Sequence, residues 1–116
     1  MSPPQVAYKV LTADQMAALE AGGTFAGAPV DLADGYIHLS TAAQLDETVA
    51  KHFAGQGDLH VAAIDLPVLG DAVRWEESRG GQLFPHVYAA LPLSAVIAYG
   101  PLERDEYGKV RLPVAG

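Results

Sequence analysis

The sequence has no cysteine among its 116 residues. It therefore has no disulfide framework, no thiol nucleophile and no thiolate ligand for a metal, which suits a reducing compartment. It also has no apolar run that approaches the roughly 20 residues of a membrane span. Residues 1–4 lack the basic and apolar segments of a secretion signal. We therefore expect a soluble cytoplasmic protein.

Basic residues are scarce. Seven Lys and Arg stand against 14 Asp and Glu, which gives a formal net charge of −7. Such a chain repels phosphate backbones and anionic lipid, so we expect no extended nucleic-acid binding and no membrane binding. With 50% hydrophobic residues, the chain can bury a core as a single domain over residues 1–116. The expected partner is a small-molecule ligand in a cleft, and the composition leaves the oligomeric state open.

Strand and helix signals alternate at the front of the chain. Residues 6–11 alternate polar and apolar side chains and predict a first strand. Thr12 and Gln15 have the spacing of a capping box, which predicts a helix over residues 13–21. The stretch 24–35 is rich in Gly, Pro and Asp and is predicted to be a surface connection.

Strands dominate the rest of the chain. Thr41 and Gln44 repeat the capping-box spacing and predict a second helix that ends near residue 53. Beyond it, apolar or alternating stretches are separated by breaks rich in Gly and Pro. The expected strands cover residues 59–66, 73–76, 83–89, 95–99 and 107–112. Two early helices followed by strands predict an α+β fold.

The stretch 34–41 joins a glycine turn, a strand and a helix start. In its strand the apolar residues face a core, while Tyr36, His38 and Ser40 share the opposite face. A strand that runs into a helix N-terminus leaves backbone N–H groups beside Ser40 and Thr41, which suits an anion or a polar ligand. An imidazole at this place can act as a general base or a donor near neutral pH.

A second strand repeats this arrangement, because His86 and Tyr88 fall on one face of the stretch 83–89. We predict that the two strands face each other, so that His38 and His86 meet across one groove. The glycine-rich segment 78–81 is predicted to be mobile and is either a lid over that groove or a long turn.

Glu76 ends a short strand beside Trp75, and a carboxylate next to an indole in a cleft can have a raised pKa and serve in acid–base chemistry. Structural interpretations remain open beside the functional ones. Glu76 can simply pair with Arg74 or Arg79, and Trp75 can belong to the core. Ser40 and Thr41 can be helix caps, and His38 can be a structural residue of a strand.

These motifs together resemble the bacterial family called domain of unknown function 952, and the similarity spans nearly the whole chain. The resemblance rests on Asp34–Thr41, Trp75–Ser78, Gly80–Gly81 and Phe84–Tyr88 in this order. It implies an ADP-ribosyltransferase-like fold, with two small β-sheets around a cleft that binds NAD and two helices in the N-terminal part.

The resemblance also implies roles for particular residues. Ser40 and Thr41 fall where some transferases place a Ser-Thr pair beside nicotinamide. Those transferases usually carry a His or Arg on the first strand, where this chain has Lys9, and often a Glu on a late strand, where this chain has His86.

Several functions therefore stand open. The first is an ADP-ribosyltransferase-like enzyme, or a degenerate relative, that uses NAD or another nucleotide. Its expected catalytic residues are His38, Glu76 and His86, and its expected ligand-binding residues are Tyr36, Ser40, Thr41, Trp75, Ser78 and Tyr88.

The second function is a metal-dependent enzyme that binds zinc or iron through His38, His86 and Glu76, although their spacing is no known metal signature. A third is a non-catalytic module that binds a small ligand or a protein. A phosphoesterase with two His-x-Ser/Thr motifs ranks last, because His38 and Ser40 supply only one copy.

Overall fold

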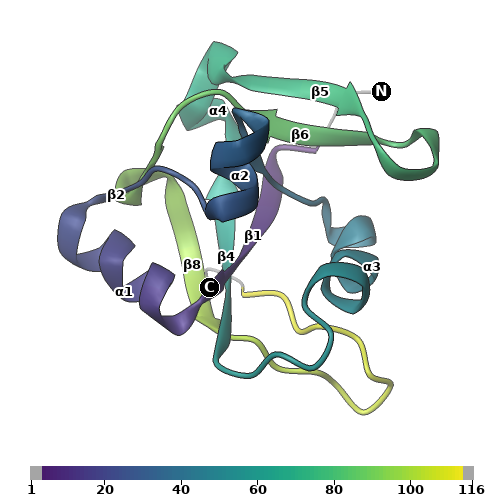
Figure 1. Cartoon of the computed structure of the whole chain (residues 1–116). Coiled ribbons are helices and arrows are strands. Elements are labelled where there is room, and N and C mark those ends of the chain that lie inside the picture. Colours follow the sequence, from purple (N-terminus) through teal and green to yellow (C-terminus); the bar gives the residue numbers. More distant parts are fainter. Residues whose placement is uncertain (1–3, 114–116) are drawn as a thin grey trace.

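A three-stranded antiparallel sheet forms the centre of the computed structural model, which describes residues 4–113. Its strands β1 (Val6–Thr12), β4 (Leu59–Asp65) and β8 (Val96–Pro101) lie in the order β1-β4-β8 (Figure 1). The near-continuous apolar run at 59–66 predicted a strand buried on both faces, and β4 confirms it as the central strand.

Helices α1 (Ala13–Gly22) and α3 (Ala42–His52) cover the two faces of this sheet (Figure 1). The buried residues of α1 are Met16 and Leu19, which join the core on one face. Leu45 and Val49 of α3 join a separate core on the other face. Each buried pair repeats at the three- to four-residue spacing of an amphipathic helix.

The predicted capping box at the start of α1 is confirmed. The Gln15 N–H donates to the Thr12 hydroxyl at 3.1 Å, and the Thr12 N–H donates to the Gln15 side chain at 2.9 Å. At the other end, Gly23 closes the helix in the left-handed conformation, with φ of 82°.

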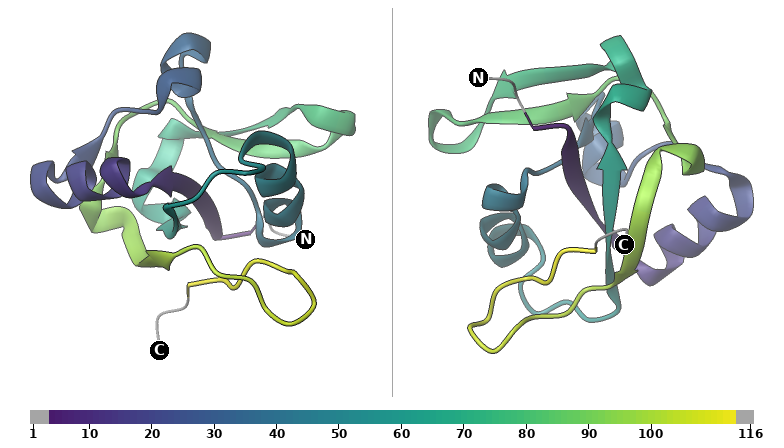
Figure 2. Two further views of the ribbon diagram at one scale, coloured as in Figure 1. Left: turned by 60° about the horizontal axis from the view of Figure 1, so that its bottom comes forward. Right: turned by 180° about the vertical axis from the view of Figure 1, so that it is seen from behind.

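A second three-stranded sheet crosses one end of the first (Figures 1 and 2). Its strands lie in the order β3 (Ile37–His38), β6 (Leu83–Val87) and β5 (Val73–Glu77). One bridge joins the two sheets, since the Tyr8 N–H donates to the Ser40 carbonyl at 2.7 Å and the Ser40 N–H donates back at 2.9 Å. Beyond this bridge β1 and β3 take different partners, and the sheets separate.

The remaining elements are small. Strands β2 (Thr24–Phe25) and β7 (Leu91–Pro92) form a two-stranded sheet, and α4 (Leu66–Leu69) leads from β4 into a 3₁₀ turn. Residues 4–113 thus form an α+β fold with four helices and three antiparallel sheets, where we expected two sheets. No helix within 4–113 is long and apolar enough to cross a membrane.

The prediction of a surface connection at 24–35 is wrong. This stretch contains β2 and a helix, α2 (Pro29–Asp34), which begins with a proline at its first turn and ends at Gly35 in the left-handed conformation. Asp31, the one buried residue of α2, is only 1% exposed. The buried residue of this six-residue helix is polar, so the sequence of α2 has no hydrophobic periodicity that would predict a helix.

Another sequence prediction fails. No strand forms at 107–112, where the described chain has only an isolated bridge between Arg104 and Val110. The segment expected to be a loop contains a short 3₁₀ turn, Arg79–Gly81, at the tip of the β5–β6 hairpin. Nearby, the α3 side chain of Gln44 donates to the Leu83 carbonyl at 2.9 Å.

The close approach of Gly27 to Asp31 of α2 can be tested by mutation. The φ of Gly27 is 133°, a backbone conformation that disfavours other residues. A Cβ there would lie 2.9 Å from the Cβ of Asp31. We expect Gly27→Ala to lower the free energy of unfolding by roughly 1–3 kcal/mol in urea denaturation. Gly57→Ala is the matched control, because its Cβ would meet open space. Equal stabilities of the two variants would contradict the tight approach at Gly27.

Candidate active site

A cleft of about 640 Å³ lies where the two larger sheets separate. Its walls come from β1, α2, α3, β3 and β6. The lining includes Lys9, Val10, Pro29, Asp34, Tyr36, His38, Ser40, Ser78, Phe84 and His86.

The structure brings His38 and His86 together. They are direct cross-strand partners on β3 and β6, and their ring centroids lie 5.5 Å apart. We expected two strands that face each other across a groove, whereas the strands are neighbours in one sheet. Cross-strand partners point to the same face of a sheet, so this pairing suffices to place both rings at one site.

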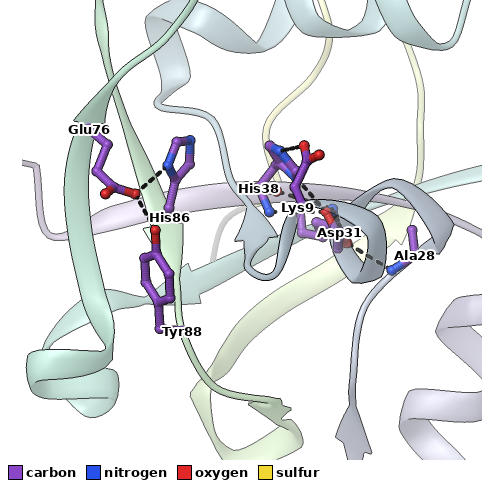
Figure 3. A network of polar contacts seen from close by, with 8 residues as sticks. Lys9, Ala28, Asp31, His38, Glu76, His86 and Tyr88 are labelled. Atoms are coloured by element: carbon purple, nitrogen blue, oxygen red, sulfur yellow. Dashed lines mark hydrogen bonds and ion pairs between the residues drawn. The ribbon is translucent and has the colours of Figure 1, made fainter.

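A buried carboxylate orients His38 (Figure 3). Oδ1 of Asp31 lies 2.7 Å from Nδ1 of His38 and also accepts the His38 backbone N–H at 3.1 Å. The Lys9 ammonium lies 2.9 Å from Oδ2 of Asp31 and donates to the His38 carbonyl at 3.1 Å. The backbone N–H of Ala28 donates to Asp31 at 2.8 Å. Asp31 therefore ties β1, α2 and β3 together at one point.

These contacts keep Asp31 ionised. Burial alone would raise its pKa, but the hydrogen bond from His38 and the charge of Lys9 outweigh burial and hold the pKa well below its usual range. Burial lowers the pKa of Lys9, and attraction to Asp31 opposes that shift. We conclude that a paired ammonium and carboxylate lie beneath His38, since neither charge is stable there alone.

A second carboxylate faces the other nitrogen of the His38 ring. Oδ2 of Asp34, the last residue of α2, lies 2.9 Å from Nε2 of His38. A carboxylate only accepts hydrogen bonds, so both contacts are hydrogen bonds when the ring carries a proton on each nitrogen. His38 therefore bridges two carboxylates, Asp31 at Nδ1 and Asp34 at Nε2.

His86 forms its own pair with a carboxylate (Figure 3). Its Nδ1 lies 2.8 Å from Oε1 of Glu76, and the Tyr88 hydroxyl donates to the same oxygen at 2.8 Å. The hydrogen bond to His86, and then the one to Tyr88, lower the pKa of Glu76. Because an ionised Glu76 accepts the Nδ1 proton, Nε2 of a neutral His86 ring is left as a proton acceptor.

Tyr36 connects the two histidines. Its ring stacks on His86 at a centroid distance of 4.1 Å and lies 4.7 Å from the ring of His38. Desolvation raises the pKa of Tyr36, and the negative charges of Asp34 and Glu76 raise it further. The phenol therefore stays protonated in a negative field at the centre of the site.

Other predicted site residues have different positions. Trp75 packs against the core, and its cross-strand partner is Pro85, so it does not share the face of His86. Ser78 lines the cleft.

The Ser-Thr pair makes structural contacts. Thr41 is the N-cap of α3, and its N–H donates to the Gln44 side chain at 3.0 Å. The Ser40 hydroxyl lies 2.8 Å from that of Thr48. Thr48 donates to the Gln44 carbonyl, so the proton in the Ser40 contact comes from Ser40. These contacts favour the capping and packing interpretation of both residues.

Sequence analysis missed Asp31 and Asp34, which lie in the stretch that we assigned to a loop. The one local signal is the four-residue spacing from Asp34 to His38. Asp31 gives no such signal, because its importance depends on Lys9, which is 22 residues away.

The metal interpretation gains no support from the geometry. Within the described chain, residues 4–113, no group of three or more His, Cys, Asp or Glu is placed to hold a metal ion. Glu76 and Nδ1 of His86 hydrogen-bond to each other. In this arrangement the two groups contact each other and do not both face a shared metal ion.

Comparison with known proteins identifies relatives without assigning an activity. The family model for the protein of unknown function DUF952 matches residues 10–99. The X-ray structure of protein CC0527 from Caulobacter crescentus is similar, with a TM-score of 0.83, 44% sequence identity and coverage of 92% of this chain and 94% of that one. The solution NMR structure of CC0527 has a TM-score of 0.79 at 43% identity, and the match covers 94% of each chain. None of the curated proteins matches the chain.

The buried ion pair can be tested by a double-mutant cycle. We expect Lys9→Met to lower the free energy of unfolding by roughly 3–5 kcal/mol, because it leaves the Asp31 carboxylate buried without its cation. Adding Asp31→Asn removes that stranded charge, so the double variant should lose less than the sum of the two single losses. Urea denaturation gives the free energy of unfolding of the unaltered protein, the two single variants and the double variant. Strict additivity would mean that the two side chains do not interact.

Proposed function

This chain belongs to DUF952, a family of proteins of unknown function, and we propose that it is an ADP-ribosyltransferase-like enzyme acting on NAD or a related nucleotide. The reaction breaks the N-glycosidic bond between ribose and nicotinamide in the cleft beside the two histidines. One observation carries the proposal. His38 and His86 are cross-strand partners, and Nδ1 of each ring lies within 2.8 Å of a carboxylate oxygen.

His86 is the general base in this proposal. Glu76 accepts the Nδ1 proton and thereby fixes the ring orientation, so Nε2 can take the proton of an attacking hydroxyl group. The new bond forms between that oxygen and C1′ of the ribose. The electron pair of the broken bond leaves with the nicotinamide nitrogen, which balances the reaction.

The charge pattern of the site supports this reaction class. Positive charge develops on the sugar as a glycosidic bond breaks, and nearby carboxylates stabilise it. Desolvation raises the pKa of the Tyr36 phenol, and the negative charges of Asp34 and Glu76 raise it further. A cationic pyridinium ring is also attracted to aromatic faces, such as those of Tyr36 and Tyr88.

One observation favours the non-catalytic alternative. Both nitrogens of the His38 ring already contact carboxylates, so this ring has no nitrogen left for a substrate until one contact opens. A module that has kept the fold and lost turnover would show the same arrangement. In that case the cleft binds a small ligand, and substitution of His38 weakens binding only.

Nicotinamide release from NAD, followed by chromatography, tests the proposal. We expect measurable release by the unaltered protein, and a loss of about 100-fold or more for His86→Gln because the general base is gone. Glu76→Gln should also slow the reaction, since the amide no longer fixes the ring. Glu77→Gln is the matched control, because its exposed side chain follows Glu76 on β5 and points to the other face.

The thermal melting temperature of each variant must be measured to separate loss of function from loss of fold. If no nicotinamide is released at millimolar NAD but calorimetry detects binding of NAD or ADP-ribose, the protein is a binding module and not an enzyme. Absence of both turnover and binding would reject the nucleotide site.

A further inference from the structure

The two carboxylates that contact His38 are held very differently. Asp31 is 1% exposed and is fixed by contacts with Lys9, Ala28 and the His38 backbone. The side chain of Asp34 is 45% exposed, and its ion pair with Nε2 of His38, at 2.9 Å, is the contact that holds it in place. Of the two contacts, only the Asp34 contact can therefore open without disturbing the core.

The position of Asp34 allows it to move. It is the last residue of α2, which has six residues and only one buried side chain, Asp31. Gly35 follows with φ of 88°, and solvent surrounds the outer face of the helix, where Leu32 is 65% exposed. A rotation of the Asp34 side chain, or a small change at Gly35, takes the carboxylate away from the ring.

The ring nitrogen that Asp34 contacts lies beside the cleft, which Asp34 and His38 both line. When Asp34 leaves, Nε2 of His38 loses the carboxylate oxygen that lies 2.9 Å away, while Asp31 keeps its contact with Nδ1. An oxyanion from a ligand can then take the place of Asp34 and accept a hydrogen bond from the Nε2 N–H.

We propose that the Asp34 carboxylate occupies an oxyanion subsite, and that a carboxylate or phosphate group of the ligand displaces it to bind Nε2 of His38. The inference rests on the proposed function in taking this cleft as the substrate site. It adds the chemical class of the ligand group that binds beside His38, and it makes Asp34 an internal competitor of that group.

Inorganic phosphate and acetate are the probes, and no turnover is needed. Asp34→Ala removes the competitor, so the dissociation constant should fall about tenfold if Asp34 occupies the subsite for roughly 90% of the time. Asp14→Ala is the control, since it removes an equal charge from an exposed position on α1. Calorimetry gives the dissociation constants, and the ¹⁵N shift of His38 Nε2 during titration identifies the site.

Tighter binding of phosphate alone assigns the subsite to a phosphate group, and tighter binding of acetate alone assigns it to a carboxylate. Tighter binding of both supports an oxyanion of either kind. Unchanged affinities in Asp34→Ala, or a gain without a shift at Nε2 of His38, would overturn the inference. Because no NAD is present, a failure to cleave NAD is distinguishable from a failure of the oxyanion subsite.

Discussion

The buried ion pair between Lys9 and Asp31 is the constraint on which the site depends. Removing two charges from water is costly, so the pair persists only while every remaining acceptor of the carboxylate is satisfied. Asp31 meets that demand with donors from β1, from the residue before α2 and from β3. The same set of contacts that stabilises the pair therefore also fixes the backbone and the ring of His38.

The second histidine depends on strand register. Pairing of β3 with β6 sets His86 beside His38, and pairing of β6 with β5 sets Arg74 opposite His86, on the face that Glu76 shares. A shift of one residue in either pairing would turn the imidazole or the carboxylate to the opposite face. Two histidine–carboxylate pairs with a tyrosine stacked against them thus result from the register of one sheet and from one buried ion pair. Acid–base chemistry requires groups held in such a defined geometry.

Much of the fold could be predicted from short-range signals. The period-two alternation of residues 36–40 predicted which residue of β3 faces the core, and capping-box spacing located the start of α1. Glu76 was predicted to be a site residue, and its carboxylate lies 2.8 Å from Nδ1 of His86. Helix α2 could not be predicted, because a tertiary contact of Asp31 stabilises it in place of a hydrophobic stripe. The relative position of the sheets was equally out of reach, since it depends on long-range contacts such as the Tyr8–Ser40 bridge and the hydrogen bond from Lys9 to the His38 carbonyl.

The central claim is that two histidines share one site and that a carboxylate orients each of them. Long-range ¹H–¹⁵N NMR of the imidazole rings at neutral pH tests it most directly, because it shows which ring nitrogen carries the proton. The account predicts that His86 carries its proton on Nδ1 and that nuclear Overhauser contacts connect the rings of His38 and His86. A His86 ring protonated on Nε2 alone, with no contacts to His38, would contradict it.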